Sequence, residues 1–275
     1  MLINFLFKQF IGRLFKMKVQ RIYLCENSIE GIFTAIYQAW SSRYGHANIK
    51  IQEKNDMGLY SNFELFSEYF MVETDLTLVT KVSRSIKEKI SDEAYQMVYR
   101  VGISNYKGKA DLIYRFLIFG FSVGPKILGH LSNEIVGQIY KINRYVSNEV
   151  HHMHGFIRFS EQENRILVSV IHPKNNILAL IAPHFADRLP EERFIIIDGN
   201  RKIAVLHLPG KSWVLIGLPN YSEASYYQYS SKEEEYQDLW KAFFENIAIK
   251  ERTNFNLQRN NLPLRFRKDM TEFQS

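Results

Sequence analysis

The sequence predicts an α+β protein with a mostly helical N-terminal part, then an antiparallel β-meander, then a closing C-terminal helix. Three observations predict it. Helical spacing of apolar residues dominates residues 76–154. After Gly155 the spacing changes from the helical period to the alternation typical of strands, in several short stretches. Helical spacing returns from Glu233 to Ile247.

Composition limits the class of protein. The 275 residues suffice for one α+β domain over residues 19–275, with 19–154 and 155–275 as its possible lobes. The single cysteine, Cys25, excludes an internal disulfide and an iron–sulfur cluster held by this chain alone. A chain with one cysteine suits a reducing compartment, so we expect a cytoplasmic protein. No run of about 18 apolar residues occurs, so we expect no membrane span. Phosphate-binding and dinucleotide-binding glycine motifs are absent, so no cofactor is expected.

Positive charge is concentrated at the two ends of the chain. Residues 1–20 carry four cations and no acid, and residues 250–268 carry a formal charge of +5. This distribution favours contact between the termini and anionic partners. Residues 1–16 fit a basic amphipathic helix that docks on a membrane surface or a protein partner. Alternatively, Met17 is the true start and residues 1–16 are an upstream extension, within the 1–18 segment that precedes the α+β domain.

The N-terminal part reads as alternating strands and helices. A strand is expected over residues 20–25, followed by a helix capped by Asn27 or Ser28 and a weak strand over 48–52. Residues 64–72 are ambiguous. One helix is expected over 76–100, and 109–121 predicts a buried helix because it is apolar nearly all round.

The central stretch combines a helix end with titratable side chains. A helix is expected from near Pro125 to Gly155, with its last turns carrying Glu149, His151 and His154. Strands then follow over 156–159, 165–172, 193–197, 202–207 and 213–217, with a short helix over 177–186 and a turn at Asp198-Gly199-Asn200. The tail from Thr253 reads as irregular.

The histidines leave several interpretations open. His151 and His154 have the spacing of two ligands on one helical face, but no second ligand cluster exists and no metal site is expected. They could instead contact a phosphate or base, or simply complement the helix dipole. His184 and Asp187, in PHFADR, could orient a nucleophilic water or form an Asp–Arg pair. Glu149, His151, His184 and Asp187 are therefore the candidate catalytic residues.

The C-terminal tail interleaves cations, amides and aromatic residues, the combination that contacts phosphates, base edges and unpaired bases. With Arg158 near the centre, the candidate nucleic-acid contacts are Gln258, Arg259, Arg265, Arg267 and Lys268. The same composition fits a tail that packs back on the body, or one that binds an acidic protein.

Several motifs, in one order along the chain, carry a resemblance. They include Tyr23-Leu24, Glu30-Gly31, residues 149–159, PHFADR, Asp198 with Arg201, LWKAFFENIAIKER and Asn254 to Arg265. From about Ile22 onward the chain resembles a bacterial family called probable DNA metabolism protein, which carries a domain of the DUF4130 type. One departure is His154, where a basic residue usually follows Met153.

The resemblance implies a partner. Family members accompany a radical-SAM protein of DNA modification or repair, and some are fused to a uracil-DNA glycosylase. No glycosylase motif occurs in this sequence. We therefore expect an accessory nucleic-acid-binding protein of DNA repair or modification that acts with a radical-SAM partner. The alternatives are an enzyme acting on DNA or a nucleotide through the His/Asp/Glu residues, and a protein–protein adaptor without DNA contact.

Overall fold

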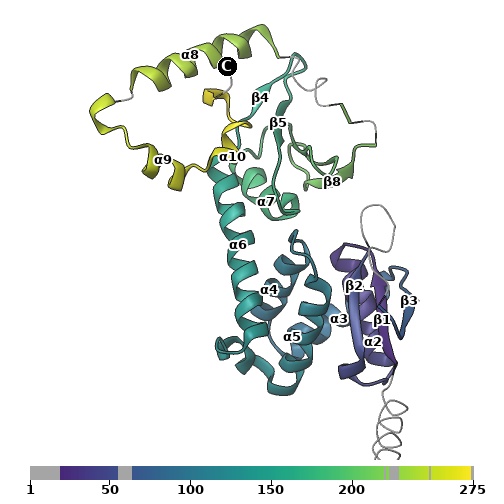
Figure 1. Ribbon diagram of the computed structural model, residues 1–275. Coiled ribbons are helices and arrows are strands. Elements are labelled where there is room, and N and C mark those ends of the chain that lie inside the picture. Colours follow the sequence, from purple (N-terminus) through teal and green to yellow (C-terminus); the bar gives the residue numbers. More distant parts are fainter. Residues whose placement is uncertain (1–18, 55–63, 220, 223–228, 248, 274–275) are drawn as a thin grey trace, which may run out of the picture. The chain divides into compact units, whose positions relative to one another are not determined.

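The structure is a computed structural model that describes residues 19–54, 64–219, 221–222, 229–247 and 249–273 (Figure 1). The chain divides into two compact units, an N-terminal unit of residues 1–144 and a C-terminal unit of residues 145–275. The helix expected over residues 1–16 lies outside the described residues. Helices and strands mix in both units, as the sequence predicts for an α+β protein.

The N-terminal unit opens with a small parallel sheet. Its strands are β1 (Gln20–Cys25), β2 (Ile49–Glu53) and β3 (Ser67–Met71), in the order β2-β1-β3. Both neighbours run parallel to β1 because the chain crosses over between strands, first through α2 (Ile29–Ser41) and η1 (His46–Asn48). Ser28 caps α2 by accepting a hydrogen bond from the backbone N–H of Gly31 at 3.0 Å.

Helices complete the unit: α3 (Leu76–Lys89), α4 (Asp92–Gly102), α5 (Lys109–Val123) and η2 (Gly124–Gly129). The single helix predicted over 76–100 is in fact two. The side chain of Ser91 accepts a hydrogen bond from the N–H of Ala94 at 3.1 Å, so it caps a new helix where periodicity alone suggested continuation.

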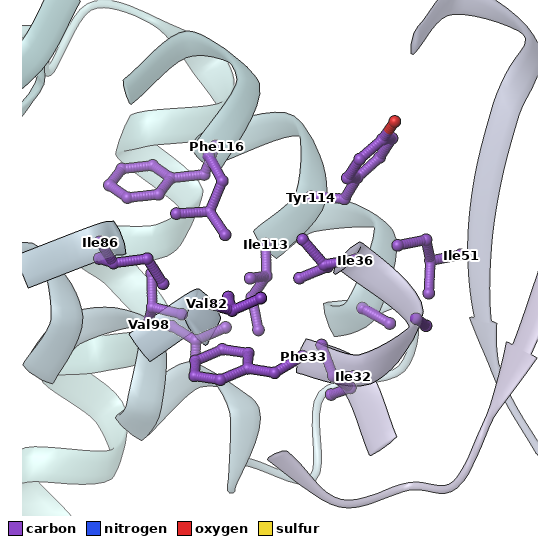
Figure 2. Close-up of a cluster of buried hydrophobic side chains, with 14 of the residues drawn as sticks. Ile32, Phe33, Ile36, Ile51, Val82, Ile86, Val98, Ile113, Tyr114 and Phe116 are labelled. Atoms are coloured by element: carbon purple, nitrogen blue, oxygen red, sulfur yellow. The ribbon is translucent and has the colours of Figure 1, made fainter. Parts of the chain in front are cut away.

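Apolar side chains from α2, α3, α4 and α5 form the core of this unit (Figure 2). Burial on this scale supplies the main favourable term in folding. The side chains that Figure 2 shows meeting at the centre of this core include Phe33, Ile36, Val82, Ile86, Val98, Ile113 and Phe116.

The segment Lys109–Gly129 is long and apolar enough to cross a membrane by length and composition alone. Its apolar residues have another role in the fold. Ile113, Phe116 and Leu117 are fully buried in the core of the N-terminal unit, as expected for a helix that is apolar nearly all round.

Cys25, the last residue of β1, lies in the same core and is fully buried. Its Sγ lies 3.7 Å from the carbonyl oxygen of Gln52. Burial, with a contribution from the nearby Glu53 carboxylate, raises the pKa of the thiol to about 12. The thiol is therefore un-ionised at neutral pH.

The longest helix, α6 (Glu134–Phe156), connects the two units. It begins nine residues later than Pro125, which lies in the short helix η2. Its start is set by Asn133, whose side chain accepts from the N–H groups of Ile135 and Val136 at 3.0 and 3.3 Å. It ends at Phe156, one residue beyond the glycine expected to close it.

The C-terminal unit is built on a five-stranded sheet. Its strands are β4 (Ser160–Glu161), β5 (Leu167–Ile171), β6 (Phe194–Asp198), β7 (Ile203–His207) and β8 (Val214–Gly217), in the order β4-β5-β6-β7-β8. The predicted antiparallel meander is not confirmed, because β5 and β6 are parallel while the other pairs are antiparallel. The reason is α7 (Leu178–Arg188), which returns the chain so that β6 starts at the same end as β5.

The chain closes with α8 (Ser231–Asn246) and a series of short helices rather than an irregular tail. These are η4 (Lys250–Arg252), α9 (Phe255–Asn261), α10 (Leu264–Arg267) and η5 (Thr271–Phe273). Asn254 caps α9 by accepting from the N–H of Leu257 at 3.0 Å, and Pro263 precedes α10. Asparagine and proline, which suggest a loop from composition, therefore mark helix starts here.

Replacing Phe33 by alanine removes a large side chain that is only 1% exposed in the N-terminal core. We expect the free energy of unfolding to fall by about 3–5 kcal/mol, because the cavity adds to the lost apolar burial. Leu76→Ala is the control, since Leu76 is 67% exposed, and we expect a change within about 0.5 kcal/mol. Urea unfolding measures both, and equal effects would contradict the assignment of this core.

Candidate functional site

The Glu149 carboxylate is buried in the C-terminal unit, where its side chain is 1% exposed. Oε1 accepts a hydrogen bond from the backbone N–H of Lys174 at 3.0 Å. Oε2 accepts from the N–H of Asn175 at 2.9 Å and from its side-chain amide at 2.6 Å. Arg265 supplies the balancing charge, with Nη2 3.3 Å from Oε1. A buried carboxylate that is paired and hydrogen-bonded in this way avoids the cost of an isolated buried charge.

The loop that Glu149 holds, residues 172–175, is held from a second side by the β6–β7 turn. Arg201 donates to the carbonyl oxygens of Pro173 and Lys174 at 3.2 and 2.6 Å, and Asn200 donates to that of Pro173 at 3.0 Å. Asp198 fixes Arg201 in turn, with an ion pair of 2.8 Å. Burial raises the pKa of Asp198, although hydrogen bonds from Arg201 and Asn200 oppose the shift.

The third side of the loop is held by Asp269, from the segment after α10. Its two oxygens contact the backbone N–H of His172 at 3.0 Å and the His172 Nδ1 at 2.8 Å. The opposite edge of the imidazole lies against the turn, because a Cβ on Gly199 would be only 2.6 Å from Nε2. Only glycine leaves room there for the ring. We call Glu149, His172, Asn175, Arg201, Arg265 and Asp269 the polar cluster.

A second ion pair ties the C-terminus to the end of α6. Arg158 donates to Glu272 through Nη2 at 2.8 Å and Nε at 3.3 Å, in the bidentate geometry that suits a carboxylate. Its Nη1 also donates to the carbonyl oxygen of Gly155 at 2.9 Å, so it caps α6. Burial opposes ionisation of Glu272, yet the hydrogen bonds from Arg158 and Trp240 help to lower its pKa below its usual value.

His154 of α6 and His184 of α7 stack on one another. Their ring centroids are 4.2 Å apart, with the planes inclined by 19°. The Nε2 atom of each ring is buried and has no hydrogen-bond partner among the described residues. Burial, followed by the charges of His184 and His151, lowers the pKa of His154. The lowered pKa favours the neutral form of the His154 ring in this stack.

The four candidate catalytic residues are not joined into one chemical group. Glu149 is buried in the polar cluster, His184 stacks on His154, and His151 and Asp187 are exposed. In the described part of the chain no hydrogen bond connects any two of these four side chains. A general base needs a hydrogen bond to the proton it removes and an oriented partner, and this set provides neither between its members.

The i, i+3 spacing of His151 and His154, which is compatible with two metal ligands, does not bring these two rings together on a shared ligand. His154 meets His184 rather than sharing a ligand with His151. Across the ranges that the structure describes, no group of three or more His, Cys, Asp or Glu side chains is placed to hold a metal ion.

The candidate nucleic-acid contacts fall into two groups. Arg158 and Arg265 are held in ion pairs with buried carboxylates, and Arg267 lies over the Phe273 ring with its guanidinium carbon 5.0 Å from the centroid. By contrast, every residue from 251 to 261 is exposed, including Gln258 and Arg259. We call residues 251–261 the α9 segment.

The aromatic residues of the tail also divide. Phe255, at the start of α9, is 68% exposed, whereas Phe266 is 3% exposed. Phe266 packs against His152 and Phe156 with ring centroids 5.4 and 5.3 Å away, so it is not available to stack on a base. Lys268 is exposed and follows α10 directly.

The partners of these residues were missed from the sequence. No sequence motif marked Asn175, Asp269 or Glu272. In the structure Asn175 hydrogen-bonds to Glu149, Glu272 pairs with Arg158, and Asp269 contacts His172. The available signal was local: Asn175 follows the His-Pro-Lys turn, and acidic Asp269 and Glu272 interrupt a basic tail.

These features define an α+β protein whose C-terminal unit is organised around buried carboxylates and ends in an exposed basic segment. The sequence profile of a family described as a domain of unknown function, DUF4130, matches residues 107–272, and the chain belongs to this family. The match covers the polar cluster and the α9 segment, whereas Tyr23-Leu24 and Glu30-Gly31 lie before it.

Other comparisons add little. No curated protein matches the chain. Among solved structures, the chain is similar to the crystal structure of an uncharacterized protein from Helicobacter pylori G27, with 8% sequence identity over 82% of this chain and 99% of that one. The TM-score of 0.21 is too low for this likeness to carry an argument about fold or function.

Replacing Glu149 by alanine leaves two backbone N–H groups without an acceptor and takes the carboxylate away from Arg265, whose side chain is 32% exposed. We expect the free energy of unfolding to fall by about 2–4 kcal/mol, mainly because each N–H group left unpaired costs about 1–3 kcal/mol. Urea unfolding measures this loss, and hydrogen exchange at the amides of Lys174 and Asn175 shows whether the loop opens. The control is Glu163→Ala, an exposed acid expected to change stability by less than about 0.5 kcal/mol. Unchanged protection of both amides would contradict the assignment.

The histidines at the end of α6 predict a loss of stability in acid. The folded state lowers the pKa of His152 and His154 below their usual 6.5, so the unfolded chain binds protons more readily. Their contribution is full above pH 6.5 and declines as the pH falls through that value toward the lowered folded-state pKa. We expect the double variant His152→Gln, His154→Gln to lose stability less steeply between pH 7 and about pH 5. Thermal unfolding at a series of pH values measures the slopes, and parallel slopes would rule out these two histidines as the cause.

Proposed function

We propose that this protein is an accessory nucleic-acid-binding protein that binds single-stranded DNA through the α9 segment. The observation that carries the proposal is the exposure of that segment. Phe255 is 68% exposed, and Arg252, Gln258 and Arg259 on the same segment are exposed with it. Cations contact phosphates, aromatic faces stack on unpaired bases and amides hydrogen-bond to base edges.

Charge around the α9 segment supports the same proposal. Residues 250–268 carry a formal charge of +5, which attracts a polyanion and releases counterions when it binds. Part of this charge is used within the fold, because Arg265 neutralises Glu149. We therefore assign direct phosphate contact first to Arg252 and Arg259, with Lys268 as a neighbouring cation.

A single strand fits this surface better than a duplex. In a duplex the base faces are covered by their neighbours, so an exposed phenylalanine has no face to stack on. The α9 helix has only seven residues, and the aromatic residue stands at its start beside Asn256. A short helix with one aromatic residue and flanking cations matches the requirements of an unpaired, flexible strand.

The role in DNA repair or modification, and a radical-SAM protein as partner, belong to this proposal through the family resemblance. The enzymatic alternative has less support. The Glu149 oxygens are already occupied by backbone amides, Asn175 and Arg265, so the carboxylate has no lone pair directed at a substrate.

Two variants of the full-length protein test the proposal. In Arg252→Ala, Arg259→Ala, we expect weaker binding to a fluorescent oligonucleotide and a slope of log K against log salt that is smaller by about 1.4, which is two contacts at about 0.7 each. In Phe255→Ala, we expect a loss of about 1–3 kcal/mol of binding free energy. Fluorescence anisotropy at several salt concentrations measures both.

The matched control removes two exposed cations from elsewhere in the same unit, in the variant Arg188→Ala, Lys211→Ala. It has the same net charge as the first variant, so a general electrostatic effect would weaken both equally. Equal weakening, or binding that does not depend on salt, would refute an interface on the α9 segment. An absence of binding by the unmodified protein would refute the function itself.

A further inference from the structure

The last turns of α6 present an exposed face whose chemistry resembles that of the α9 segment. Tyr145 is 42% exposed, and Asn148 and His151 are exposed as well. Each of these residues lies three positions after the one before it, so their side chains are neighbours along the surface of the helix. A phenol ring, an amide and an imidazole therefore stand together on this face, and we call Tyr145, Asn148 and His151 the α6 patch.

The tyrosine of the α6 patch is held in place by the polar cluster. Arg265 donates from Nη1 to the Tyr145 hydroxyl at 3.2 Å, and its guanidinium carbon lies 5.9 Å from the centroid of the ring. Arg265 is itself fixed by the buried Glu149 carboxylate, with Nη2 3.3 Å from Oε1. The hydroxyl thus has a partner within the fold, while part of the ring stays open to solvent. A ring that is ordered beforehand loses less conformational freedom when it binds.

The carboxylates of the same segments are withdrawn from solvent. Glu149 is the only acid of α6 beyond Glu134 at its start, and its side chain is 1% exposed. In the segment after α10, the side chains of Asp269 and Glu272 are 10% and 4% exposed. Each of these three is paired within the fold, so none of them faces an anion that approaches the α6 patch. This favours a ligand that carries negative charge.

The α6 patch lies close to the α9 segment along the chain. Helix α10 packs against the last turns of α6 through Arg265 and Phe266, and α9 comes directly before it (Figure 1). Arg265 follows Arg259, the last cation of the α9 segment, by six residues, and six residues of chain span at most about 20 Å. A single strand bound on the α9 segment therefore reaches the α6 patch with a few more nucleotides.

We propose that the α6 patch is a second nucleotide contact, which binds the part of a single DNA strand that extends past the α9 segment. The inference rests on the proposed function and adds a second site to it. Tyr145 stacks on an unpaired base, the Asn148 amide hydrogen-bonds to a base edge, and a ring N–H of His151 donates to a phosphate oxygen. Two contacts on one strand bind it more tightly than either contact alone.

The test compares two fluorescent single-stranded oligonucleotides of about 4 and about 16 nucleotides, which span the range of site sizes of such proteins. The short strand occupies the α9 segment, which holds Phe255 and two exposed arginines, and the long strand also reaches the α6 patch. In full-length Tyr145→Ala, we expect the long strand to bind at least about fivefold more weakly, which is the loss of one stacked base. The short strand should keep its affinity. Fluorescence anisotropy at one fixed salt concentration measures both.

Further variants separate stacking from a structural role of the tyrosine. Tyr145→Phe keeps the ring and loses only the hydroxyl that accepts from Arg265, so its affinity for the long strand should stay close to that of the unmodified protein. Asn148→Ala should weaken the long strand about two- to tenfold, as expected for one lost hydrogen bond. Tyr236→Ala, which removes a 57% exposed tyrosine from α8, is the matched control and should bind both strands normally.

The outcomes distinguish this inference from the proposed function. If Tyr145→Ala binds the long strand normally, or weakens both strands equally, the second contact is refuted, even where Phe255→Ala supports the first. Equal losses in Tyr145→Phe and Tyr145→Ala would mean that the hydroxyl acts through Arg265, and would overturn stacking on the ring. If the unmodified protein binds neither strand, the proposed function itself fails. Normal binding of the short strand by Tyr145→Ala also shows that this variant folds.

Discussion

The buried carboxylate of Glu149 is the group on which the C-terminal unit depends. It joins three segments that are distant in the sequence: the end of α6, the 172–175 loop and the residue Arg265 of α10. Arg201 and Asp269 also hold the 172–175 loop through hydrogen bonds to Pro173 and His172. Arg158 also holds the end of α6 through a hydrogen bond to Gly155. A buried charge placed in this way adds little net stability against an apolar alternative, but it makes one arrangement of its partners far more favourable than others.

This arrangement divides the cations of the C-terminal unit by role. Arg158, Arg201 and Arg265 neutralise carboxylates that are almost completely buried, so their charge is used within the fold. The exposed cations of the α9 segment have no such acid in their immediate sequence apart from Glu251. The net charge of the segment therefore overstates how many cations can contact a partner, because the arginines paired with buried acids must be left out of the count.

Much of the local structure followed from the sequence. The helices near 29–41, 109–123 and 231–246, and the β6–β7 hairpin, lie within a few residues of the predicted positions. Strand direction did not follow, although the signal was present. A helix separates β1 from β2 and another separates β5 from β6, and a crossover helix favours parallel pairing. Alternation identifies strands, but the length of the connection decides how they pair.

The site was harder to predict because its contacts are long-range. Glu149 was singled out for its chemistry, yet its partners stand 25 and 26 residues away and, for Arg265, much further along the chain. The periodicity of apolar residues carries no information about contacts between side chains so far apart in the sequence. Composition also could not separate Phe255 from Phe266, since exposure differs between them only because α10 turns Phe266 toward the rings of His152 and Phe156.

The burial of Cys25 has a practical consequence for study of this protein. Maleimides and similar reagents react with the thiolate, and a thiol with a pKa of about 12 in a closed core is almost never in that form at neutral pH. Since the chain has no other cysteine, one introduced on an exposed position would be the only reactive thiol. A single dye or spin label can therefore be attached to an introduced, exposed cysteine without first replacing Cys25.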